Sequence, residues 1–209
     1  MAFEVILLNF RIGDMVQRKS YNKDIIFTID KIVIINNESI AILKGATKRL
    51  QATAPLSDLE MASRCEVKKR IKIVDNRLDE KAEEYLKRTR NKRLNSPYMY
   101  TGRILHLDGD KKYSEKSIKY YKKLGLNAVV RNIPESRQPY VVTSLLNRYN
   151  PDILVMTGHD AILKRGKNYN DLYNYRNSKY FVNGVKEARK WGKDSKKLVI
   201  FARCMSKLF

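Results

Sequence analysis

The 209-residue sequence contains only two cysteines, Cys65 and Cys204. This number is too small for a disulfide framework, and the two residues lack the paired spacing that is typical of a zinc site. We therefore expect no disulfides, no metal and no cofactor. The low cysteine content also fits a reducing cytoplasm.

Long apolar runs are absent as well. No segment approaches the roughly 20 apolar residues that a membrane-spanning helix needs, so no membrane association is predicted. The short apolar run Val5 to Leu8 has no basic leader and no small-residue cleavage site, which argues against a signal peptide. We expect the protein to stay where it is made.

Acidic residues are scarce relative to basic ones, with 22 Asp and Glu against 43 Lys and Arg and a net charge of +21. Such a charge attracts nucleic acid, anionic surfaces or acidic proteins. The sequence shows no recognised nucleic-acid-binding motif, and its aromatic residues do not form an obvious stacking platform. A non-enzymatic nucleic-acid-binding protein nevertheless stays open as an alternative, and steeply salt-dependent binding would identify it.

The first part of the chain, residues 1–60, is rich in short β-branched and aliphatic runs joined by turn formers such as Asn36 and Asn37. This pattern predicts a small SH3-like β-barrel. From Met61 to Asn95 there is no glycine or proline, and charged residues dominate. Residues 61–97 are therefore predicted to be a charged helical connector, which ends where Pro97 disfavours helical geometry at Ser96.

Residues 98–209 alternate between short apolar segments and amphipathic helical patterns, which predicts a parallel sheet covered on both faces. Ligands of such sheets bind beyond the carboxyl ends of the strands. Three segments occupy those positions: His106 to Asp110, Thr157 to Asp160, and the residues from Arg203 onward.

His159 and Cys204 follow two successive predicted strands and form a candidate dyad. An imidazole beside a thiol can take its proton and leave a nucleophilic thiolate. The alternative for His159 is a hydrogen-bonded structural histidine. His106 is expected to lie in the core, and Asp108 and Asp110 are expected to cap a turn and the following helix rather than bind a metal.

Several segments, in this order, resemble the YabG family, the sporulation-specific proteases of endospore-forming bacteria. They are IGDMVQRKSYNKDIIF, AILKGATKRLQATAPLSDL, GRILHLDGD, PDILVMTGHDA, YRNSKYFV and KLVIFA. The resemblance implies a caspase- and clostripain-like cysteine protease that processes spore-coat and germination-related proteins in the mother cell, in association with the spore coat. It further implies His159 as general base and an oxyanion hole near Gly158.

The end of the sequence departs from that pattern. The family reads approximately FAGACQS after the last strand and continues, whereas this chain reads FARCMSKLF. We can write a codon series that would encode the segment AGACQSYFE. If one base is inserted after the first codon of this series, its translation becomes the residues from Ala202 to Phe209, followed by a stop codon. On this hypothesis the chain is C-terminally truncated by a frameshift and inactive, its α/β domain is incomplete, and Met205 replaces the nucleophile, one position after Cys204.

Overall fold

The computed structural model describes residues 10–95, 101–163, 171–192 and 198–205, and of residues 91–95 and 203–205 it describes the backbone alone. The chain divides into two compact units, residues 1–74 and 75–209. The apolar run from Val5 to Leu8 and the expected helix end at Ser96 and Pro97 lie outside the described residues.

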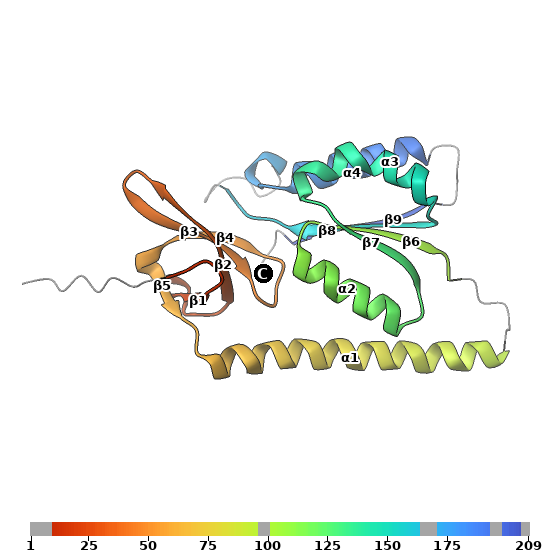
Figure 1. Cartoon of the computed structure of the whole chain (residues 1–209), viewed down its shortest axis with the longest axis horizontal. Coiled ribbons are helices and arrows are strands. Elements are labelled where there is room, and N and C mark those ends of the chain that lie inside the picture. Colours follow the sequence, from red (N-terminus) through yellow and green to blue (C-terminus); the bar gives the residue numbers. More distant parts are fainter. Residues whose placement is uncertain (1–9, 96–100, 164–170, 193–197, 206–209) are drawn as a thin grey trace, which may run out of the picture. The chain divides into compact units, whose positions relative to one another are not determined.

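The first unit is a five-stranded antiparallel sheet with the strand order β4-β3-β2-β1-β5 (Figure 1). Its strands are β1 Met15–Arg18, β2 Ile26–Ile35, β3 Glu38–Gly45, β4 Gln51–Pro55 and β5 Leu59–Met61. Asn36 and Asn37 both have positive φ, as a tight hairpin turn between β2 and β3 requires. The predicted short strands joined by turns are confirmed, while the SH3-like form of the unit stays a prediction.

Apolar side chains from every strand of this sheet form its core. The fully or almost fully buried members are Val16, Phe27, Ile29, Ala41, Leu43, Ala54 and Leu59. Beside them, the basic segment after β1 is held by internal contacts. Asp58 accepts hydrogen bonds from the Ser20 main-chain N–H at 2.8 Å and from Arg18 Nε at 2.9 Å. Burial by itself would raise the pKa of Asp58, but these bonds outweigh it and lower the pKa.

Helix α1 runs over Arg64–Asn95 and corrects the predicted connector at its start, because Met61 belongs to β5. Ser63 sets the helix start: its hydroxyl accepts the Glu66 N–H at 3.2 Å, and its carbonyl accepts the Val67 N–H at 3.0 Å. The pattern Ser-x-x-Glu is a known helix-start signal, so the sequence contained the correct boundary.

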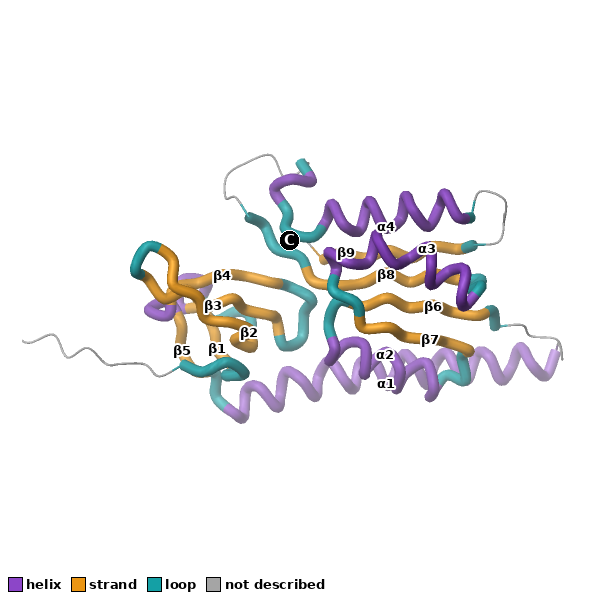
Figure 2. Tube along the Cα trace, turned by 45° about the horizontal axis from the view of Figure 1, so that its top comes forward, coloured by secondary structure: helices purple, strands orange, loops and turns teal. Residues whose placement is uncertain are grey.

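The second unit contains a four-stranded parallel sheet with the order β7-β6-β8-β9 (Figure 1). The strands are β6 Arg103–Asp108, β7 Asn127–Asn132, β8 Ile153–His159 and β9 Val199–Met205, and the connecting helices are α2 Lys111–Lys123, α3 Gln138–Tyr149 and α4 Ser178–Trp191. Helix α2 covers one face of the sheet, and α3 and α4 cover the other (Figure 2). The predicted parallel α/β sheet is confirmed.

The main core of this unit lies between the sheet and α3 and α4. Leu105 and Leu107 of β6 point to this side and pack with Leu146 of α3 and Phe181 of α4. Alternate strand residues point to opposite faces. His106 and Asp108 consequently face α2, which places the polar groups of β6 on the other side of the sheet.

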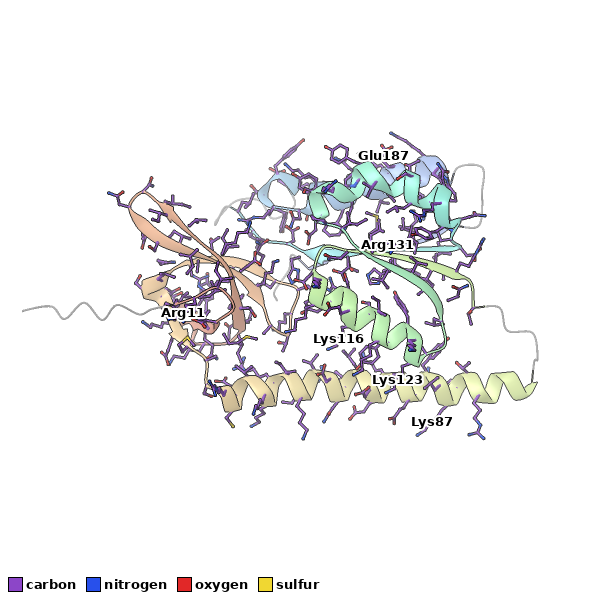
Figure 3. The ribbon with its side chains drawn as sticks, in the orientation of Figure 1. Arg11, Lys87, Lys116, Lys123, Arg131 and Glu187 are labelled. Carbon is purple, nitrogen blue, oxygen red and sulfur yellow. The ribbon has the colours of Figure 1, made fainter. Side chains whose placement is uncertain are left out.

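The part of α1 that belongs to the second unit packs along α2 through ion pairs. Lys116 Nζ lies 2.5 Å from Asp75 Oδ1, and Lys123 Nζ lies 2.7 Å from Asp79 Oδ1 (Figure 3). The hydrogen bond from Lys123 lowers the pKa of Asp79, and the same bond raises the pKa of Lys123. These partly exposed pairs orient the helices more than they stabilise them.

Strand β9 lies at an edge of the sheet, and two of its apolar side chains remain solvent-accessible. Val199 is 48% exposed and Phe201 is 59% exposed. In the part of the chain that the structure describes, no helix has the length and apolar composition needed to cross a membrane.

Candidate active site

The carboxyl ends of β6 and β8 lie side by side, because these two strands are paired in parallel register. Strand β7 lies on the far side of β6, so the chain's progression through the sheet reverses between β6 and β8. Ligands of open α/β sheets bind at such a reversal point. The residues at the ends of β6 and β8 are therefore the ones most worth examining.

His159 is the last residue of β8 and is only 2% exposed. Its side chain lies on the α2 side of the sheet, where the ring packs edge-on against Tyr113 with a centroid distance of 5.4 Å. Its Nδ1 atom lies 3.9 Å from Oδ2 of Asp110. The structure thus places the predicted histidine at the expected edge, next to a carboxylate.

Asp110 is the N-cap of α2, as the sequence predicted. Its Oδ1 accepts the Tyr113 N–H at 3.1 Å, while its own N–H donates to Asp108 Oδ1 at 2.9 Å. Asp108 is completely buried and also accepts the Thr157 hydroxyl at 2.9 Å. The two aspartates therefore connect the ends of β6 and β8 to the start of α2. Among the described residues, no group of three or more His, Cys, Asp and Glu side chains is placed to hold a metal ion.

Glu135, in the short 3-10 helix Glu135–Arg137, lies over this edge of the sheet. Its Oε1 accepts the main-chain N–H of His159 at 2.8 Å. An added Cβ at Gly158 would lie 2.5 Å from Glu135 Cγ, and one at Gly109 would lie 2.2 Å from its Cδ. The close approach of Glu135 therefore requires glycine at both positions. The main-chain N–H of His159, directly after Gly158, therefore donates to this carboxylate. An oxyanion hole near Gly158 stays a prediction.

Strand β9 pairs with β8 in parallel, so the segment that contains Cys204 does lie beside the strand of His159. The register sets Cys204 opposite Gly158 and Met205 opposite His159. Neighbouring strands lie about 4.8 Å apart. The backbone position level with the histidine is therefore that of Met205.

His106 is buried, as predicted, and belongs to a hydrogen-bonded chain beneath α2. Its Nε2 lies 2.7 Å from Thr157 Oγ1, and its Nδ1 lies 3.1 Å from the Tyr121 hydroxyl. The Thr157 hydroxyl in turn donates to Asp108, so the chain of contacts runs from Tyr121 through His106 and Thr157 to the Asp108 carboxylate. Burial, and then the charge of Asp108, raise the pKa of Tyr121.

Asp160 connects the end of β8 to the start of α4. Its Oδ1 accepts the N–H groups of Ala161 and Asn177, both at 2.8 Å, and its Oδ2 accepts the Ser178 hydroxyl. The Asn177 side chain in turn donates to the His159 carbonyl at 2.8 Å. These contacts fix the backbone at His159 from the α4 side. Local sequence patterns did not assign a role to Asp160, Asn177, Tyr113 or Glu135.

His159 is a candidate catalytic histidine at the end of a central parallel strand, and a strand that contains a cysteine lies beside it. This arrangement is compatible with a hydrolase. Comparison with known proteins decides the class. The family model described as YabG peptidase U57 matches residues 11–208. The chain belongs to the YabG peptidase family. The sporulation-specific protease YabG of Bacillus subtilis (strain 168) is 38% identical to it, over 93% of this chain and 72% of that protein.

Membership in the YabG family confirms the resemblance seen in the sequence and makes proteins the substrate class. It favours a peptidase over the nucleic-acid-binding alternative. The matched region includes the β8 segment with His159, the β6 end with Asp108 and Asp110, and β9. The catalytic type and the residues that carry it are addressed by the proposal below.

Proposed function

We propose that this YabG-family chain has the design of a sporulation-specific cysteine endopeptidase, with His159 as the general base. The observation that carries the proposal is the position of His159 at the carboxyl end of β8, where β9 runs alongside in parallel. A thiol on β9 level with the imidazole would lose its proton to His159, and the thiolate would attack the scissile carbonyl carbon. The protonated imidazole then returns that proton to the leaving amine.

The oxyanion of this reaction needs hydrogen-bond donors that are fixed in advance. The main-chain N–H groups around Gly158 are the proposed source, and the one at His159 now donates to Glu135. A substrate carbonyl would have to replace the Glu135 carboxylate at this N–H. The acidic side chain therefore covers the proposed oxyanion position in the substrate-free chain.

The nucleophile position is the distinctive part of the proposal. The register sets Met205 level with His159 and Cys204 level with Gly158. Successive strand residues point to opposite faces, so a shift of one position changes the face on which a side chain lies. We place the family's nucleophile at position 205, where methionine has no ionisable thiol. With methionine at this position, we expect the chain to have little or no protease activity.

The biological setting is carried over from the family. The relative's name ties it to sporulation, and we propose the same setting here: the mother-cell cytoplasm, with spore-coat and germination-related proteins as substrates. The strongly cationic chain would favour acidic protein substrates by long-range attraction.

A set of substitutions tests the proposal. Met205→Cys should create proteolytic activity on a denatured protein substrate, because it restores a thiol level with His159. His159→Ala in the Met205→Cys chain should abolish this activity, and a thiol-alkylating reagent should do the same. Activity that survives His159→Ala would refute the role of the histidine.

Cys204→Ala is the matched control for the nucleophile. In the Met205→Cys chain it should leave the activity in place, because Cys204 lies at the level of Gly158. If the unsubstituted chain is active and Cys204→Ala abolishes that activity, the nucleophile is Cys204 and our assignment of position 205 is wrong.

A further inference from the structure

The first turn of α2 contacts His159 through two of its residues. Asp110 Oδ2 lies 3.9 Å from His159 Nδ1, and the Tyr113 ring packs edge-on against the imidazole. The same two residues are joined by the N-cap bond from the Tyr113 N–H to Asp110 Oδ1. One carboxylate thus begins the helix with one oxygen and faces the imidazole with the other.

A closed series of contacts fixes the position of this carboxylate. The Asp110 N–H donates to Asp108, Asp108 accepts the Thr157 hydroxyl, and Thr157 lies two residues before His159 on β8. The backbone that carries Asp110 is thereby tied to the strand that carries His159. Side chains held through such supporting contacts keep a working geometry more accurately than isolated ones.

We propose that Asp110 is the positioning residue of His159, and that its carboxylate sets the tautomer and raises the proton affinity of the imidazole. This inference rests on the proposed role of His159 as general base. A carboxylate on the Nδ1 side favours the tautomer with its proton on Nδ1, which leaves the Nε2 lone pair to accept the proton of a nucleophile. Separations of this kind are often long without substrate and shorten in the working complex.

Other charged and titratable groups also face His159 or its backbone. Tyr113 contacts the ring from α2, and Glu135 accepts the main-chain N–H from its 3-10 helix. Asp108 of β6 acts through Thr157, and Asp160, next in the chain, is engaged by Ala161, Asn177 and Ser178. The N-terminus of α2 opposes a positive imidazolium. The Asp110 carboxylate is the one that faces the ring itself, with Oδ2 at 3.9 Å from Nδ1.

The test uses the fact that the chain has only two histidines. With ¹³C-labelled imidazoles, an NMR pH titration follows both rings in the whole chain. The signal that is missing from the His159→Gln variant belongs to His159, and the remaining signal belongs to His106. Asp110→Asn should lower the midpoint of the His159 titration by about one pH unit or more, since a nearby negative charge favours the imidazolium. The midpoint of His106 should not change.

Two further variants guard against a purely structural explanation. Asn and Ser are both good N-cap residues, so Asp110→Asn and Asp110→Ser should keep α2 intact and shift His159 alike. Glu135→Gln removes a charge that faces the main chain rather than the ring, and it should shift the midpoint less. An unchanged His159 midpoint in the Asn and Ser variants, or an equal shift in Glu135→Gln, would overturn the assignment.

This measurement does not depend on protease activity, so it separates the inference from the proposed function. In the active Met205→Cys chain, Asp110→Asn should lower kcat by about tenfold or more with little change in KM, and should move the acidic limb of the pH profile downward. If His159→Ala leaves activity intact while the NMR shift is seen, the function fails and the pairing stands. If activity needs His159 but Asp110→Asn changes neither midpoint nor profile, the inference alone fails.

Discussion

The contact of Glu135 with Gly158 leads to a quantitative prediction for the variant Gly158→Ala. An added Cβ would lie 2.5 Å from both Cγ and Oε1 of Glu135, whereas non-bonded carbon atoms prefer about 3.5–4.0 Å. The Glu135 side chain must therefore move by about 1 Å or more. Its 2.8 Å hydrogen bond to the His159 N–H would not survive such a displacement.

The expected cost follows from that bond. Hydrogen bonds to charged groups contribute about 1.5–3 kcal/mol, and water at the half-buried Glu135 reduces this to about 1–2 kcal/mol. The backbone adds no penalty, because Gly158 is not among the glycines with positive φ. Glu135→Ala removes the same bond, so it should destabilise the second unit by a similar amount.

The double variant gives the decisive measurement. Gly158→Ala combined with Glu135→Ala should cost no more than Glu135→Ala alone, because the methyl group then meets no side chain. The two effects should therefore fall short of additivity by about 1–2 kcal/mol. Urea unfolding followed by the fluorescence of Trp191, the single tryptophan, reports on the second unit.

Gly192→Ala serves as a control, since a Cβ there would lie 3.4 Å or more from its nearest neighbours. This variant should change the free energy of unfolding by less than about 0.5 kcal/mol. Additive effects of Gly158→Ala and Glu135→Ala, within about 0.5 kcal/mol, would show that the two residues do not interact as described.

Two further predictions concern the two cores. The lowered pKa of Asp58 means that its interactions stabilise the first unit above pH of about 3.9 and are lost as the pH falls through the lower folded value. Asp58→Asn should therefore flatten the acid limb of stability that hydrogen exchange of β1 and β5 measures, and an unchanged acid limb would contradict this reading. Leu146→Ala should destabilise the second unit by about 2–5 kcal/mol in the Trp191 assay, because Leu146 is completely buried, and a cost below about 1 kcal/mol would contradict the core assignment.

Much of the second unit could be predicted from local patterns. The apolar segments around Leu105 and Leu154 and the amphipathic helices between them define strands and helices by their periodicity alone. The position of His159 at a strand end was predictable for the same reason, and ligands of parallel sheets bind at such ends. The role of Asp110 as a helix cap also follows from sequence, because Asp before a helical pattern is a standard start signal.

The contacts within the site could not be predicted, because they depend on the order of the strands. Asp110 faces His159 only because β6 and β8 are neighbours, and no local pattern specifies that pairing. Glu135 lies in a short turn whose sequence resembles any polar loop, and its approach is visible only through Gly109 and Gly158. The start of α1 differs, because the spacing of Ser63 and Glu66 marks it in the sequence itself.

The order of the strands in the second sheet also determines when the site can exist. The sheet grows outward from β6, yet the site combines the end of β6, the turn after β7, the end of β8 and the backbone of β9. A ribosome must therefore have released nearly the whole described chain before His159 has all its neighbours. This topology delays assembly of the site until β9, the last described strand, has left the ribosome.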